Sequence, residues 1–149
     1  MKNIKIRQAT SKDVPALFDL IMAIAKHHNQ EEHVLTDKDE LLKAGFAAEP
    51  EFQVILVEYE EEIAGYLSYT WNYSIWNGKS YMNLDDLFVK EKFRGLKIGH
   101  ELMRKAKSIC ENKSSGLIRW EVEKDNQKAI EFYERLGVKM VEKGIFKWK

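Results

Sequence analysis

Residues 84–103, LDDLFVKEKFRGLKIGHELM, join a strand-like stretch to a helix through a charged, glycine-containing turn. The first six residues are apolar or β-compatible, and apolar residues recur at helical spacing from Ile98 onward. The free N–H groups and the aligned peptide dipoles of a first helical turn stabilise an anion at that point. Three side chains that suit phosphate gather at the same helix end: Arg94, Lys97 and His100. The segment therefore predicts a site for an extended polyphosphate.

A second segment, NQKAIEFYERLGV at residues 126–138, opens another helix. The two segments together resemble the GCN5-related N-acetyltransferases (GNAT), which move acetyl from acetyl-CoA to an amine. The resemblance rests on Arg-x-x-(Gly)-x-Gly at residues 94–99, where Lys97 stands at the bracketed glycine, and on Asn-x-x-Ala-x-x-Phe-Tyr-x-x-x-Gly at residues 126–137. Residues 6–36 and 75–89 are most similar to the spermidine/spermine and thialysine N-acetyltransferase branch. Acetyl-CoA is the implied co-substrate, and a homodimer is the implied assembly.

The resemblance assigns catalysis to Asp85 and Tyr133. A lysine-like amine has a pKa near 10.4, so only about one molecule in a thousand is neutral at pH 7 and a base must remove a proton. Asp85 stands where the branch usually has Glu, and its shorter side chain increases the need for a bridging water. Tyr133 matches a tyrosine placed near the thioester sulfur, where a phenol can donate a proton to a thiolate. Strand carboxylates paired with Lys or Arg, and a tyrosine packed in the core, are the structural alternatives.

The resemblance also implies which residues contact the cofactor. The main chain of the strand would pair with the pantetheine arm, and an N–H of Phe88 or a neighbour, freed by a bulge, would hold the thioester carbonyl. The N–H groups from Gly95 to Gly99 would hold the pyrophosphate. Lys97 departs from the usual glycine, and a solvent-exposed lysine there is the alternative to a phosphate contact. The cofactor residues expected are Leu87, Phe88, Val89, Arg94, Gly95, Leu96, Lys97, Ile98, Gly99, His100, Asn126 and Arg135.

The acceptor amine would meet His27, His28, Trp76, Asp85 and Asp86. Trp76 could form a pocket wall, stack on a cation or pack a loop. Polyamine enzymes of the branch look to have acidic residues where this chain has His28 and Ser74, which weakens the polyamine interpretation. No carboxylate or Cys ligand stands beside the histidines at a recognised metal spacing, so no metal is expected.

Composition fits one domain over residues 1–149, with 44% hydrophobic and 32% charged residues. No apolar run approaches 18 residues, and the N-terminus has no apolar signal region. The single Cys excludes an internal disulfide. These features predict a cytoplasmic protein without membrane contact. Residues 31–62 contain eleven acidic and two basic residues, whereas residues 90–113 contain eight basic and three acidic residues. The basic segment suits the phosphates of CoA and the acidic segment a cationic amine, although two solvated faces would have the same distribution.

The elements that position these residues alternate between strand and helix. Strands are expected at 4–7, 53–59, 63–71, 79–89, 117–123 and within 138–149; helices are expected after Thr10 or Ser11, after Thr36, from about residue 98 and over 126–136. Strands 79–89 and 117–123 should be parallel neighbours by the crossover rule. The fold class is α/β, and the resemblance implies a mixed central sheet of six to seven strands with about four helices and two central, splayed parallel strands.

The leading hypothesis is direct acetyl transfer to a primary amine of a small cationic acceptor, either a diamine or polyamine or a lysine-like amino acid. A protein lysine or N-terminal acetyltransferase is one alternative, and a non-catalytic CoA-responsive or nucleic-acid-associated module is another. Zero formal net charge and a pI near 6.9 argue against nucleic-acid binding.

Overall fold

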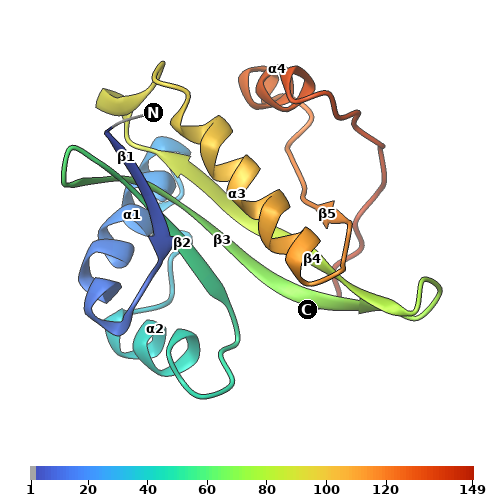
Figure 1. Ribbon diagram of the computed structural model, residues 1–149, viewed down its shortest axis with the longest axis horizontal. Coiled ribbons are helices and arrows are strands. Elements are labelled where there is room, and N and C mark those ends of the chain that lie inside the picture. The colour runs from blue at the N-terminus through green and yellow to red at the C-terminus, as the bar shows by residue number, and fades with distance from the viewer. Residues whose placement is uncertain (1–2) are drawn as a thin grey trace.

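The computed structural model describes residues 3–149 as a mixed sheet with helices on both faces (Figure 1). The elements in chain order are β1 (Ile4–Gln8), α1 (Val14–His27), α2 (Lys38–Gly45), β2 (Gln53–Tyr59), β3 (Glu62–Ser74), β4 (Lys79–Val89), α3 (Ile98–Asn112), β5 (Ile118–Arg119) and α4 (Gln127–Arg135). The sheet order is β1-β2-β3-β4-β5. The first four strands are antiparallel neighbours, and β5 is parallel to β4. The α/β class, the meander and the parallel β4/β5 pair agree with the sequence predictions.

Each face of the sheet is covered by a helix whose apolar side chains recur every three or four residues. On α3, Ile98, Leu102 and Ala106 are buried with side chains of β2, β3 and β4. On α1, Leu17 and Leu20 pack against the opposite face in a second cluster. Strands with side chains that alternate between the two faces therefore separate two apolar cores.

The five described strands are fewer than the six to seven expected. Within residues 3–149, strand 117–123 is reduced to Ile118–Arg119, because β5 pairs with β4 only at Met82 and Asn83 and residues 120–123 form no ladder. Residues 138–149 form no strand, and Val141 and Ile145 within them are exposed. A strand needs a hydrogen-bonded neighbour, and β5 is too short to provide one. The β4/β5 pair consequently lies at one edge of the described sheet and not at its centre.

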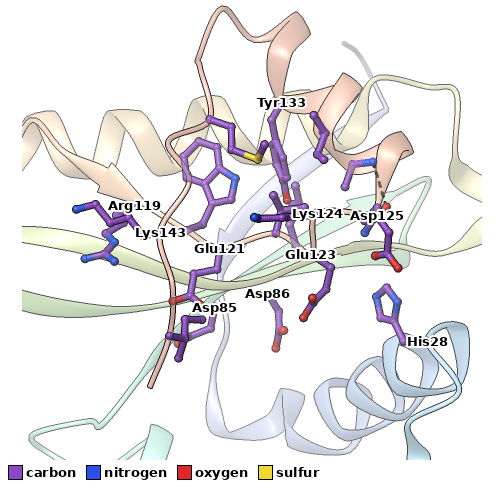
Figure 2. A pocket seen from close by; sticks show the side chains of 18 of the residues that line it. His28, Asp85, Asp86, Arg119, Glu121, Glu123, Lys124, Asp125, Tyr133 and Lys143 are labelled. Atoms are coloured by element: carbon purple, nitrogen blue, oxygen red, sulfur yellow. Dashed lines mark hydrogen bonds between the residues drawn. The ribbon is translucent and has the colours of Figure 1, made fainter. Parts of the chain in front are cut away.

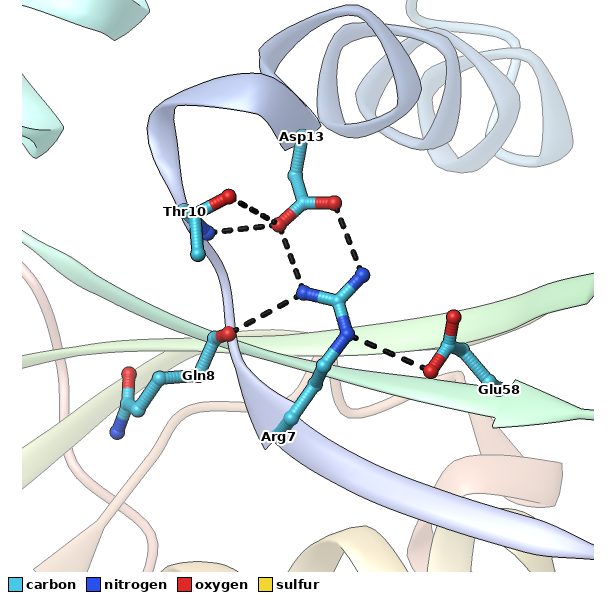
Figure 3. A network of polar contacts seen from close by, with 5 residues as sticks. All are labelled: Arg7, Gln8, Thr10, Asp13 and Glu58. Carbon is cyan, nitrogen blue, oxygen red and sulfur yellow. Dashed lines mark hydrogen bonds and ion pairs between the residues drawn. The ribbon is translucent and has the colours of Figure 1, made fainter. Parts of the chain in front are cut away.

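An ion-pair network fixes the entry into α1 (Figure 3). Arg7 donates from Nη1 to Asp13 Oδ2 at 2.8 Å and from Nη2 to Asp13 Oδ1 at 2.9 Å, and its Nε donates to Glu58 Oε2 at 3.4 Å. The backbone N–H of Thr10 also donates to Asp13 Oδ2, at 2.7 Å. Side-chain hydrogen bonding from Arg7 is the main cause that lowers the pKa of the Asp13 carboxyl to about 2. Strand β1, strand β2 and helix α1 are thereby joined through one carboxylate.

We expect this carboxylate to stabilise the fold above about pH 4 and to lose that contribution as the pH falls from about 4 to 2. The folded-state pKa of about 2 lies below the ordinary value of 3.8, so protons bind the unfolded chain first, and the difference corresponds to about 2 kcal/mol. Asp13→Asn should therefore lower the free energy of unfolding at pH 7 and have little effect near pH 2. Denaturant unfolding of the wild type and of Asp13→Asn, from about pH 2 to pH 7, measures this difference in the free energy of unfolding. Asp19→Asn, at an exposed position on α1, is the control; an equal loss at pH 2 and pH 7 would contradict the expectation.

Candidate active site

A cleft of about 1560 Å³ opens where the pairing of β4 and β5 ends (Figure 2). One wall is formed by the C-terminal half of α1 and by Asp85, Asp86 and Leu87 of β4. The other walls are residues 117–126, helix α4 and residues 138–145. Beyond Asn83 the outer edge of β4 has no strand partner among residues 3–149, so its main chain can pair with an extended ligand.

Asp85 is at this cleft because β4 contains an irregularity there. Ser68 of β3 faces Asp86 and Tyr69 faces Leu84, which leaves Asp85 as the extra residue of a β-bulge. The resemblance predicted a bulge at Phe88 or a neighbour, whereas the bulge in the structure is at Asp85, three residues earlier. Leu87, Phe88 and Val89 remain in register with β3.

The Asp85 carboxyl lies in the cleft and has a pKa above the ordinary value of an aspartate. Although the residue as a whole is largely exposed, its carboxyl lies in the cleft beside Asp86 (Figure 2). Partial burial raises the pKa of Asp85, the Asp86 charge raises it further, and the hydrogen bond from Asn83 Nδ2 at 3.0 Å lowers it. A carboxylate with a raised pKa is a better general base than an ordinary one.

Tyr133 lies on α4 and points into the same cleft (Figure 2). The ring of Trp120 packs against it with a centroid distance of 5.0 Å, and Phe132 lies at 5.3 Å. Burial raises the pKa of the Tyr133 phenol above its ordinary value of 10, so the hydroxyl keeps its proton at neutral pH and can donate it. The structure thus brings the two residues expected to be catalytic to one cleft.

The turn from Arg94 to the first turn of α3 has the shape expected of an anion-binding loop. Gly95 has a φ of 82° and Lys97 a φ of 64°, both in the left-handed region, directly before Ile98, the first residue of α3. Alternation of left- and right-handed residues turns successive N–H groups to one side. Arg94 is held by a hydrogen bond from its Nε to the Val89 carbonyl at 3.0 Å. Leu96 packs on the core, and His100 is half-buried in the first turn of α3. Gly99 lies so close to α4 that a Cβ there would be 3.2 Å from the Phe132 ring.

The positive φ of Lys97 explains why glycine suits this position, since a residue with a Cβ is strained there by about 1 kcal/mol. We expect Lys97→Gly to raise the free energy of unfolding by about 1 kcal/mol and the Tm by about 3 °C. Thermal unfolding without ligand measures the change. Lys97→Ala is the matched control because it removes the same charge but keeps a Cβ; equal Tm values for the two variants would contradict the role of backbone strain.

Of the remaining expected site residues, some line the cleft and others lie outside it. His28 lines the cleft, and Asn126 lines it too while its Oδ1 accepts from the Ala129 N–H at 3.3 Å as the cap of α4. Arg135 is exposed at the end of α4. His27, at the end of α1, does not line the cleft, and its pKa is lowered first by partial burial and then by the charge of Arg94. Trp76 is 98% exposed at the tip of the β3–β4 hairpin, and the structure does not bring it to the cleft.

Five carboxylates that line the cleft were not expected from the sequence: Glu121, Glu123, Asp125, Glu134 and Glu142. Glu121 and Glu123 line the cleft opposite Asp85 and Asp86 (Figure 2). Their spacing of two residues in an extended segment places them on one face, and that period was the available signal.

Among residues 3–149, no three His, Cys, Asp or Glu side chains are grouped so that they could hold a metal ion, and no helix is both long and apolar enough to cross a membrane.

Comparisons with known proteins give a family, curated relatives and solved structures of the same fold. Residues 15–138 match the Acetyltransferase (GNAT) family. Thialysine N-epsilon-acetyltransferase of Sus scrofa is 27% identical over 147 residues, which cover 93% of this chain and 86% of that protein. Spermidine/spermine N(1)-acetyltransferase-like protein 1 of Homo sapiens is 26% identical over 92% of this chain and 21% of its own length. An aminoglycoside acetyltransferase structure from an uncultured soil sample, in complex with trehalose, has the same fold, with a TM-score of 0.84, 19% identity and coverage of 99% of this chain and 96% of that one.

Proposed function

Because the chain belongs to the acetyltransferase (GNAT) family and is therefore an N-acetyltransferase, we propose that it transfers acetyl from acetyl-CoA directly to a primary amine of a small cationic acceptor. The observation that carries the proposal is one cleft, next to the open edge of β4, that both Asp85 and Tyr133 line. The proposed unit is a single acetyltransferase domain over residues 1–149.

The residues present fit acetyl-CoA. The open edge of β4 suits an extended arm with amide groups, and the N–H groups of residues 95–99 with Arg94 and Lys97 suit a pyrophosphate. When bound, acetyl-CoA supplies an activated acetyl group as a thioester. Leu87, Phe88 and Val89 would hold the arm, and Asn126 and Arg135 would contact it from α4.

The chain's own residues then manage two protons. Asp85 takes a proton from the acceptor ammonium, directly or through a water, so that the amine nitrogen becomes nucleophilic. Tyr133 keeps a proton on its phenol oxygen and donates it toward the departing sulfur. Asp86 gives a second negative charge beside Asp85, which favours an acceptor that is itself a cation.

The acceptor class is supported by the charges that line the cleft and by the names of the relatives. Acidic side chains outnumber basic ones in the lining of the cleft: the acids are Asp85, Asp86, Glu121, Glu123, Asp125, Glu134 and Glu142, and the bases are Arg119, Lys124, Lys139 and Lys143. The relatives described above are named for thialysine and for spermidine and spermine, all of which carry primary amines. A lysine-like amino acid or a compact diamine suits this cleft better than a long polyamine, because His28 stands where polyamine enzymes look to have a carboxylate.

We expect kcat/KM for spermine to be about 10-fold to 100-fold lower than for thialysine, since a missing charge-assisted hydrogen bond costs about 1.5 to 3 kcal/mol. The test is acetyl transfer to thialysine, lysine, spermidine, spermine, a short diamine and a peptide pool at one salt concentration. His28→Glu should raise spermine turnover relative to thialysine, whereas Ser11→Glu, at an exposed position outside the cleft, is the control. A wild-type preference for spermine of tenfold or more would instead assign a polyamine acceptor.

A homodimer and a cytoplasmic location remain predictions. Exposed apolar side chains at the β3–β4 hairpin tip and in residues 138–149 suit an interface: Ile75, Trp76, Phe146 and Trp148. Light scattering of the purified chain tests the dimer.

A further inference from the structure

The Asp86 carboxylate is held by two hydroxyl groups of the neighbouring strand. Tyr66 of β3 is only 1% exposed, and its hydroxyl donates to Asp86 Oδ2 at 3.1 Å. Ser68, two residues further on the same face of β3, has its Oγ 3.5 Å from the same oxygen and accepts from the Asp86 N–H at 3.1 Å. Among residues 3–149, no hydrogen bond is formed to Asp86 Oδ1. One carboxylate oxygen is therefore fixed, and the other is free.

Tyr66 lies among apolar neighbours that would accept phenylalanine. It packs beneath α1 with Leu17, Leu20 and Phe88. A buried hydroxyl needs a partner, and the partner of this one is a carboxylate at the cleft. Burial and the Asp86 charge both raise the pKa of the Tyr66 phenol far above its ordinary value, so Tyr66 remains a donor at neutral pH.

We propose that Tyr66 and Ser68 are positioning residues, whose hydroxyls fix Asp86 through Oδ2 and leave Oδ1 to bind the acceptor cation. This inference rests on the proposed function, because it assigns Asp86 to the acceptor of that reaction. The two adjacent carboxylates then have different roles: Asp86 is held in place as a binding group, and Asp85, with its pKa raised by partial burial and by the Asp86 charge, acts as the base.

Hydroxyl donors stabilise the ionised form of a carboxylate, whereas a neighbouring negative charge disfavours it. Because the Tyr66 hydroxyl offsets part of the Asp86 charge, Tyr66→Phe should strengthen the repulsion on Asp85 and raise the pKa of Asp85, whereas Asp86→Asn should lower it. The two variants move the titration in opposite directions. Other charged or titratable groups line the cleft from five further parts of the chain: His28 and His33 after α1; Arg119 of β5; Glu121, Glu123, Lys124 and Asp125 after β5; Tyr133 and Glu134 of α4; and Lys139, Glu142 and Lys143 of the C-terminal segment.

The test is a pH titration of the aspartate carboxyl carbons by NMR in the full chain, without acetyl-CoA or acceptor. Tyr66→Phe should raise the pKa of Asp85 by about 0.5 pH unit, and Ser68→Ala should act in the same direction. Tyr69→Phe is the matched control: Tyr69 is also buried on β3, but its hydroxyl accepts from Gln8 Nε2 at 3.3 Å. Titrations of Tyr66→Phe and Ser68→Ala that superimpose on the wild type would overturn the proposal.

A kinetic measurement connects positioning to the acceptor. At a pH well above both carboxyl pKa values, Tyr66→Phe should raise KM for the acceptor about 10-fold, with KM for acetyl-CoA and kcat nearly unchanged. Unchanged acceptor KM would overturn the assignment of Asp86 Oδ1 to the acceptor. The titration needs no turnover, so an inactive wild type with shifted titrations would reject the proposed function and leave the positioning of Asp86 supported.

Discussion

Tyr133→Phe is expected to lower kcat for acetyl transfer by about 10²-fold to 10⁴-fold, while the affinity for acetyl-CoA stays nearly unchanged. Phenylalanine keeps the ring that packs against Trp120 and Phe132 and removes only the hydroxyl. Because burial keeps the Tyr133 phenol protonated, the hydroxyl is a proton donor throughout the neutral range. Initial rates with saturating acceptor and acetyl-CoA measure kcat, and the ligand-induced rise in Tm measures cofactor binding.

The control for this variant is Tyr59→Phe. Tyr59 is also a partly buried tyrosine with an aromatic neighbour, Phe93 at 5.7 Å, but it lies on β2 outside the cleft. Wild-type kcat in Tyr133→Phe would reduce Tyr133 to a packing residue. Parallel losses of kcat and of acetyl-CoA binding would point to a distorted cleft and not to a missing proton.

Asp85→Asn should lower kcat/KM for the acceptor at neutral pH by about 10²-fold to 10⁴-fold, because an amide cannot accept the proton of the ammonium. The wild-type rate should also fall on the acid side as Asp85 becomes protonated. Since partial burial and Asp86 raise the pKa of Asp85, this fall should occur at a higher pH than for an ordinary aspartate. Rates from pH 4 to pH 9 with a single acceptor measure both effects.

Asp85→Glu is the informative companion because it keeps the carboxylate and lengthens the side chain by one methylene. It should retain much more activity than Asp85→Asn if the base acts through an adaptable water. An Asp85→Asn enzyme with a wild-type rate and an unchanged acid limb would remove Asp85 from the mechanism.

The elements on either side of the turn at residues 94–97 could be predicted from the sequence because their signals are local. The strand pattern of residues 79–89, the turn glycine Gly95 and the apolar spacing from Ile98 follow one another in one continuous segment. The resulting helix begins at the expected residue, and β4 has the expected bounds, Lys79–Val89.

The features that could not be predicted depend on distant pairing. The alternating residues after Val138 fit a strand pattern, but a strand needs a partner and β5 is only two residues long. The bulge at Asp85 depends on the register with β3, and the contact of Tyr66 with Asp86 spans 20 residues. No periodicity within one segment contains that information.

Transfer of isotopically labelled acetyl from acetyl-CoA to thialysine, measured beside acetyl-CoA binding, tests the central claim most directly. The wild type should raise its Tm with acetyl-CoA and form labelled N-acetylthialysine, whereas the Asp85→Asn/Tyr133→Phe double variant should show the same rise in Tm and form almost no product. A wild type that binds acetyl-CoA but acetylates neither thialysine nor any other small cationic amine would contradict the account and favour a CoA-responsive binding module.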